Sequence, residues 1–220
     1  MNFIKLCVLF CKFAEEQIDE SLEEKKPEEK KALNTLQDAA DRAMKNGWTL
    51  VEKVTKPINA KTVRDAVRSV VINVFGGIEN IDVATDILSA QLKLETGFKS
   101  VHNNNVGNLM AHYSTNKFWK GKVFSLLAGE VNEDNEEYFL NSLFRSYDSL
   151  NDGIADWALL LQTKFPKAVA KALQGDTVGF VTELKSGGYF TASLEKYLEG
   201  VQGVMGQFEK PKIDNPFLIT

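Results

Sequence analysis

One glutamate stands where an apolar helical pattern ends. The residues at 84, 87, 88, 91, 92 and 95 share one face of a predicted helix that Asp82 caps, and Glu95 closes this stripe with a polar side chain. Burial and the negative end of the helix dipole both disfavour a carboxylate there and raise its pKa. A carboxylic acid that keeps its proton near neutral pH can protonate a leaving oxygen. We therefore expect Glu95 to be a general acid, the alternative being a glutamate that hydrogen-bonds loop amides and locks the helix end.

The elements around this glutamate follow from hydrophobic periodicity and turn residues. An Asn-rich loop, 102–108, follows the helix, and the segment Lys122 to Phe144 predicts a hairpin whose turn is Asn132 to Glu136. One helix is expected from Asn59 to the glycines at 76 and 77. Four more are expected after residue 148, over 152–163, 166–173, 177–185 and 193–205. The fold class is therefore α+β, predominantly α, with one small β-hairpin.

The N-terminal region is predicted to be helical and separate. A helix beginning at Pro27 would bury Leu33, Leu36, Ala40 and Ala43 and end at 46–47. Apolar residues within 3–14 recur at helical spacing and predict a further amphipathic helix. We place domain boundaries to give an N-terminal helical region (1–57), a catalytic domain (58–210) and a C-terminal tail (211–220).

Composition excludes several classes of function. The 220 residues carry 26 basic and 30 acidic side chains, a net charge of −4, so no global field draws the chain to nucleic acid. Two histidines and two cysteines are too few for a zinc site made of these residues alone, and we expect no metal and no organic cofactor. No stretch approaches the length of a membrane span. Lysines interrupt the apolar N-terminus, as is not typical of a cleaved signal peptide. We therefore expect no cleaved signal peptide and synthesis in the cytoplasm.

Four patches in order resemble one known family. Residues 90–107 read AQLKLETGFKSVHNNNVG, which resembles the A-Q-x-x-L-E-[ST]-G, serine and N-N-x-x-G signature of bacterial glucosaminidases and autolysins, within the lysozyme-like superfamily. Residues 144–149 resemble the family's F-R-x-Y-x-S, and residues 188–191 resemble its G-Y-A-T, with a later tyrosine at 197. The similarity spans roughly 59–207. Ala192 replaces the family's aspartate, and the spacing from Tyr189 to Tyr197 is about two residues longer than in the family.

This resemblance implies a lysozyme-like peptidoglycan hydrolase that cleaves β-1,4 bonds of the GlcNAc-MurNAc backbone, as a glucosaminidase or a muramidase. Glu95 would be the general acid. A second carboxylate is expected on the hairpin, at Glu130 or next at Glu133. Residues expected to bind substrate are Asn104, Asn105, Gly107, Asn108, Tyr147, Tyr189 and Trp119. The asparagines and the glycine also suit a left-handed turn, and their amides could hydrogen-bond N-acetyl groups or hold Glu95.

Two other functions remain open from the sequence. A lytic transglycosylase on the same fold would need only one acid, and a non-catalytic cell-wall-binding or phage structural protein would keep the fold without the chemistry. The expected partners are peptidoglycan glycan strands and, through the N-terminal region, virion proteins, without nucleic acid. An N-terminus without the features of a signal peptide, followed by a domain expected to degrade the cell wall, suggests a phage lysin or a virion-associated enzyme. Such an enzyme would act on the cell wall from the periplasm or after delivery with the virion. A bacterial autolysin with an unusual leader is the alternative.

Overall fold

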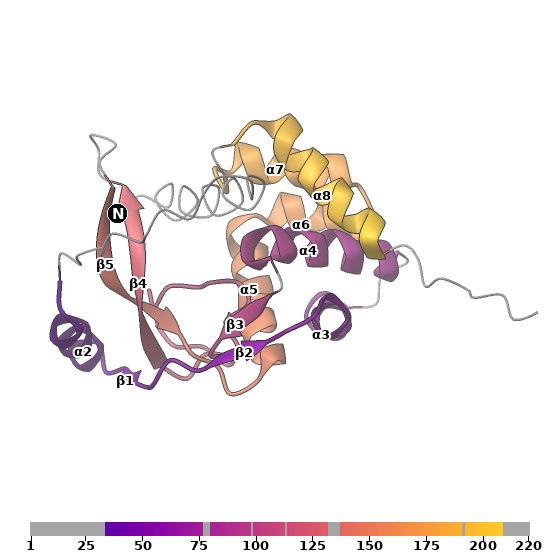
Figure 1. The fold of residues 1–220 in the computed structure, drawn as a ribbon. Helices are drawn as coiled ribbons and strands as arrows, with labels where there is room; N and C mark the ends of the chain where they lie inside the picture. The colour runs from indigo at the N-terminus through magenta and orange to yellow at the C-terminus, as the bar shows by residue number, and fades with distance from the viewer. Residues whose placement is uncertain are drawn as a thin grey trace, which may run out of the picture.

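The fold comes from a computed structural model that describes residues 34–76, 80–97, 99–112, 114–131, 137–190 and 192–208. For residues 95, 130, 131 and 137 only the backbone is described. The predicted helices within residues 3–14 and from Pro27, and the tail at 211–220, lie outside these ranges. Two parts are visible in Figure 1, a group of helices and a long hairpin with one helix against it.

The helical part contains α3 (Ala60–Phe75), α4 (Ile81–Thr96), α5 (Leu150–Lys164), α6 (Pro166–Leu173), α7 (Thr177–Ser186) and α8 (Leu194–Phe208). Helix α4 packs against α3, α6 and α8, so nearly all of its faces are buried. Both ends of α4 lie close to where the sequence predicted them. Helix α3 begins after Asn59, whose side chain accepts a hydrogen bond from the Thr62 amide. The six predicted helices of this part are confirmed to within about three residues at each end, although α4 is preceded by Asn80 as its N-cap, and Asp82 lies in its first turn.

The hairpin consists of β4 (Lys122–Val131) and β5 (Glu137–Arg145), paired antiparallel from Val123 opposite Arg145 to Val131 opposite Glu137. This confirms the predicted hairpin. The sequence missed three short strands, β1 (Thr49–Leu50), β2 (Thr55–Pro57) and β3 (Ser100–His102). Strand β1 runs parallel to β4, and β2 pairs antiparallel with β3. Two or three residues are too few to show a period, so these strands have no sequence signal of their own.

These pairings cross the predicted boundary at residue 57. Strands β1 and β2 belong to the presumed N-terminal region, yet each pairs with a strand of the main domain. Helix α2 (Leu36–Lys45) packs on the hairpin through Ala39 and Ala43, in a cluster with Trp119 and Val123. Residues 34–57 and the main domain are therefore one packed unit within the described ranges.

Helix α2 also differs from its prediction. Thr35 and Asp38 form a reciprocal capping box, so the helix begins at Leu36 and runs to the predicted end near Asn46. Leu36 is 65% exposed, and Ala39 is buried where Ala40 was expected. The capping box fixes where the helix begins, and the two small alanines, Ala39 and Ala43, pack against the sheet. Within the described ranges, no helix combines the length and the apolar character that crossing a membrane requires.

Candidate functional site

Glu95 occupies the last turn of α4. The helix ends at Gly97, whose φ of 64° is left-handed and whose amide donates to the Lys93 carbonyl at 2.7 Å. The backbone thus places residue 95 at the C-terminal, negative end of the helix dipole, as the sequence predicted. The side chain of Glu95 lies outside the described part, so its role stays a prediction.

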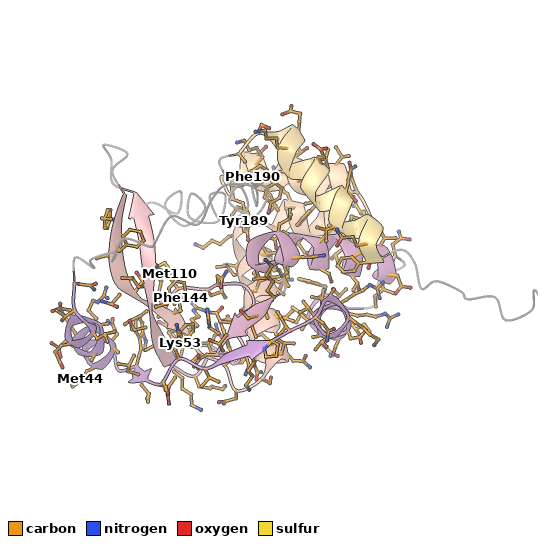
Figure 2. All side chains as sticks on the ribbon, in the orientation of Figure 1. Met44, Lys53, Met110, Phe144, Tyr189 and Phe190 are labelled. Carbon is orange, nitrogen blue, oxygen red and sulfur yellow. The ribbon has the colours of Figure 1, made fainter. Side chains whose placement is uncertain are left out.

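One turn earlier, a buried glutamine connects α4 to a tyrosine. Gln91 is fully buried, and four-residue spacing puts it on the same helix face as residue 95. Its Nε2 donates a hydrogen bond of 2.7 Å to the hydroxyl of Tyr189. The ring of Phe165 lies edge-on to Tyr189 at a centroid distance of 5.2 Å. The structure therefore brings Tyr189, from the end of α7, to the helix turn next to Glu95 (Figure 2).

The segment after Tyr189 is held by its backbone. The Nζ of Lys185 donates to the carbonyl of Ala192 at 2.6 Å and also lies over the ring of Phe190. Phe190 stacks on Tyr197 with ring centroids 3.8 Å apart and planes 4° from parallel. Because the anchor is the carbonyl of Ala192, the alanine that departs from the family pattern still takes part in fixing this segment.

The Asn-rich loop is a structural connection. Asn104 and Asn108 have φ values of 60° and 47°, in the left-handed region that the residue types predicted. Asn105 is 2% exposed, donates to the carbonyls of Leu109 and Arg145, and accepts from the Leu109 amide. Asn104 donates to a carbonyl on the segment after β5, that of residue 147. The polar atoms of Asn105 are thus bonded within the chain, and the expectation that this residue binds substrate stays a prediction.

Two glycines let this loop lie against α5. A Cβ on Gly107 would come within 2.8 Å of the Trp157 ring, and a Cβ on Gly153 would come within 2.1 Å of the Asn104 carbonyl oxygen. Gly107 itself is buried. Gly107 therefore packs closely against Trp157, which is 1% exposed and belongs to the core as predicted. Contact of Gly107 with a ligand stays a prediction.

A buried charge cluster joins the hairpin to α5. Asp156, 2% exposed, accepts hydrogen bonds from Arg145 Nη1 at 2.6 Å, from the Tyr147 hydroxyl at 2.7 Å and from Asn116 Nδ2 at 2.7 Å. Arg145 also donates to the His112 carbonyl. Sequence reasoning gave Arg145, Asp156 and Asn116 no role. The signal was present in the F-R-x-Y spacing, because residues two apart at a strand end point to the same side and can share a partner.

Trp119 and Tyr147 are both buried. Trp119 is fully buried, donates from Nε1 to the Lys122 carbonyl and lies under the Arg145 guanidinium, 4.5 Å from ring to cation. Tyr147 is 4% exposed, and burial together with the charge of Asp156 raises the pKa of its hydroxyl. Neither ring presents a face to solvent in this structure, and a role of either residue in substrate binding stays a prediction.

The second carboxylate remains a prediction. The backbone of Glu130 pairs with Tyr138 close to the turn of the hairpin, and Glu133 lies outside the described residues.

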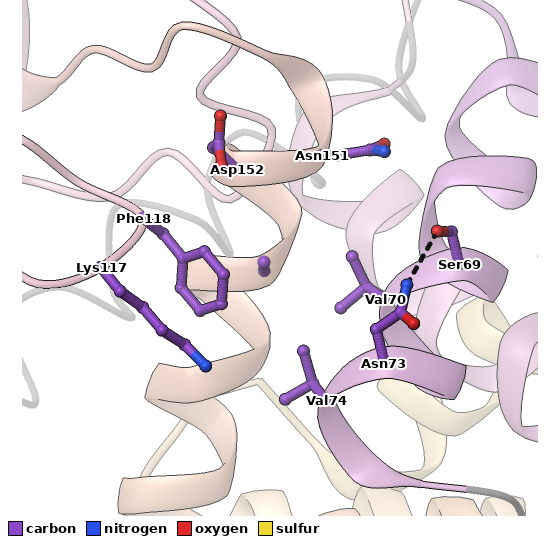
Figure 3. A pocket seen from close by; sticks show the side chains of 9 residues that line it. Ser69, Val70, Asn73, Val74, Lys117, Phe118, Asn151 and Asp152 are labelled. Atoms are coloured by element: carbon purple, nitrogen blue, oxygen red, sulfur yellow. Dashed lines mark hydrogen bonds between the residues drawn. The ribbon is translucent and has the colours of Figure 1, made fainter.

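A separate hollow of about 260 Å³ lies between α3, the start of α5 and the loop at 117–118 (Figure 3). Its walls are apolar and its rim is polar, with Asn73 Nδ2 donating to Ser69 Oγ. The lining residues are Ser69, Val70, Asn73, Val74, Lys117, Phe118, Asn151, Asp152 and Ala155.

Comparison with known proteins supports the class of fold, which is lysozyme-like and predominantly α. The structure is similar to the catalytic domain of the autolysin Auto from Listeria monocytogenes, with a TM-score of 0.51 and 16% identity over 81% of this chain and 97% of that one. Because the identity is low, this likeness establishes the fold alone.

Two further structures are more distantly similar. A peptidoglycan hydrolase mutant from Sphingomonas sp. A1 gives a TM-score of 0.47 at 23% identity, covering 67% of this chain and 96% of the other. A glycoside hydrolase domain of FlgJ from Salmonella typhimurium gives 0.48 at 20% identity, covering 68% and 97%. No family model matches the sequence, and no curated protein matches it significantly.

Proposed function

We propose that the protein is a peptidoglycan hydrolase that cleaves β-1,4 glycosidic bonds of the GlcNAc-MurNAc backbone, with Glu95 as the general acid. The observation that carries the proposal is the position of residue 95. It lies at the C-terminal end of a buried helix, one turn from a glutamine bonded to Tyr189, in a fold shared with an autolysin catalytic domain.

The chemistry follows from this position. The helix dipole and the buried surroundings of α4 favour a protonated carboxyl, which gives its proton to the oxygen of the leaving sugar as the glycosidic bond breaks. Positive charge then develops at the anomeric carbon, and water attacks it. A second carboxylate can activate this water or stabilise the charge.

Glu130 is our preferred second carboxylate because of its place on β4. Strand positions alternate between faces, so position 130 has the same parity as Phe124 and Ala128. Both residues are buried in a cluster with Phe144, and the Phe124 ring lies 6.1 Å from the ring of His102 on β3. Met110 and Phe144 of this cluster lie on the side of the hairpin that faces the helices (Figure 2). This parity favours position 130 on the same side. Glu133 is the alternative.

The test compares wild type with Glu95→Gln on isolated peptidoglycan. The exposed Glu199→Gln on α8 is the matched control, since it removes one carboxylate that faces solvent. We expect wild type and the control to clear peptidoglycan in a zymogram and Glu95→Gln to fail. Mass spectrometry of the products then identifies the bond. Anhydro ends would instead mean a lytic transglycosylase, and binding without cleavage by wild type would mean a wall-binding or structural protein.

We further propose that the enzyme is a phage lysin or a virion-associated enzyme, made in the cytoplasm and delivered to the wall, with the N-terminal region as the contact to virion proteins. The proposal is supported by the lysines within the N-terminal apolar run and by a net charge of −4, which gives no long-range attraction to an anionic wall. Export with removal of about the first fourteen residues would contradict it.

A further inference from the structure

One turn before the proposed acid, a hydrogen bond joins a buried side chain of α4 to Tyr189, which follows α7. Gln91 is 0% exposed on a helix that buries apolar residues such as Leu88 and Leu92, and it is larger than the two other buried polar residues there, Thr85 and Ser89. A buried amide costs free energy unless it is hydrogen-bonded, and an apolar side chain of similar size would fill the space without that cost. A specific role for the amide therefore explains its presence better than packing does.

The direction of the bond gives that role a chemical meaning. The Nε2 of Gln91 donates and the Tyr189 hydroxyl accepts, at 2.7 Å. A tyrosine hydroxyl carries one proton, so a hydroxyl that accepts here keeps its proton for another acceptor. The backbone of Tyr189 is bonded to the Leu184 carbonyl, and Phe165 contacts the ring edge. The ring is thus held at its backbone, at its edge and at its hydroxyl.

We propose that Gln91 is a positioning residue, which orients the hydroxyl of Tyr189 so that its proton is directed toward the reacting groups beside Glu95. This inference rests on the proposed function of Glu95. Gln91 acts through Tyr189 and does not itself contact the sugar. The spacing supports the assignment, because residues 91 and 95 are one turn apart on the same face of α4 and a tyrosine bonded to one lies near the other.

The experiment is a double-mutant cycle on the full chain with Gln91→Met and Tyr189→Phe. Methionine has a similar length and a good helix propensity, so α4 is retained. We expect Gln91→Met to lower kcat by a factor of about 2 to 10, the effect of one hydrogen bond, with little change in KM. In the Tyr189→Phe background, Gln91→Met should cause no further loss, because the hydroxyl it positions is already gone.

Ser89→Ala is the matched control, since Ser89 is equally buried on the same helix and lies two residues from Gln91. It should leave kcat unchanged. Equal losses from Gln91→Met in the two backgrounds, or a lower melting temperature with unchanged kcat, would overturn the inference. If Gln91→Met does not fold, Gln91→Leu takes its place in the cycle.

A second readout separates this inference from the proposed function. The tyrosine rings are labelled with ¹³C, and the NMR signal that disappears in Tyr189→Phe is assigned to Tyr189. This ring should flip faster in Gln91→Met than in wild type, whether or not the protein cleaves peptidoglycan. An unchanged ring signal would overturn the positioning role. Failure of wild type and Glu95→Gln to differ on peptidoglycan would refute the proposed function instead.

Discussion

Replacing Asp156 by asparagine should lower the free energy of unfolding far more than the loss of a surface ion pair would. The variant keeps the shape of the side chain but leaves the Arg145 guanidinium, 8% exposed, without its counter-charge. It also weakens the bonds from Tyr147 and Asn116, which donate to the same carboxylate. Breaking one side of a buried pair costs about 3–5 kcal/mol, so we expect the free energy of unfolding to fall by that amount.

The matched control is Asp148→Asn. Asp148 pairs with Lys122 at 2.6 Å, the same distance as the buried pair, but its side chain is 65% exposed and that of the lysine 46%. Water screens this pair, and we expect a loss of at most about 1 kcal/mol. The free energies of unfolding of both variants and wild type are compared by urea denaturation. A shift of the unfolding midpoint at an unchanged m-value measures the loss of stability. Equal losses for the two variants would refute the argument that burial of the Arg145–Asp156 pair locks the hairpin to α5.

Two further predictions concern packing and pH. Gly153→Ala should lower the free energy of unfolding by more than about 2 kcal/mol, because the new Cβ would lie 2.1 Å from a backbone oxygen. At Gly203 a new Cβ would meet nothing within 4 Å, so Gly203→Ala should be neutral or stabilising by up to about 1 kcal/mol. Thermal unfolding of the two variants checks this, and similar melting temperatures would contradict it. His112 has its pKa lowered below 6.5 by burial and then by the charge of Arg145. As the pH falls through 6.5, the unfolded chain binds the proton first, so stability decreases, and His112→Asn should show a shallower decrease between about pH 7 and 5. An unchanged pH slope would contradict this.

The sequence predicted the helical part of the fold well because its helices are amphipathic or capped. Asn59 and Pro166 start helices where they were expected to, and the turn before residue 137 separates two β-prone runs. The start of α2 was placed wrongly, because the prediction relied on Pro27 and ignored the capping box of Thr35 and Asp38. Strands β1, β2 and β3 depend on pairing with distant residues, and such pairings have no local signal.

The candidate site was predictable in part. The position of Glu95 at the helix end followed from periodicity, and the closeness of Tyr189 to α4 was implied only by the family resemblance. Burial separates the residues that could contact a ligand from those that hold the fold. Trp119 and Asn105 are of types that often bind ligands. In the structure, Trp119 lies in the core, and the side chain of Asn105 is hydrogen-bonded to the backbone of its own loop.

Product analysis after digestion of purified peptidoglycan tests the central claim most directly. Wild type and Glu199→Gln should release fragments with ordinary reducing ends, whose mass gives the bond cleaved, and Glu95→Gln should release none while still folding with an unchanged melting temperature. Equal release of fragments by Glu95→Gln and wild type would contradict the assignment of Glu95 as the general acid.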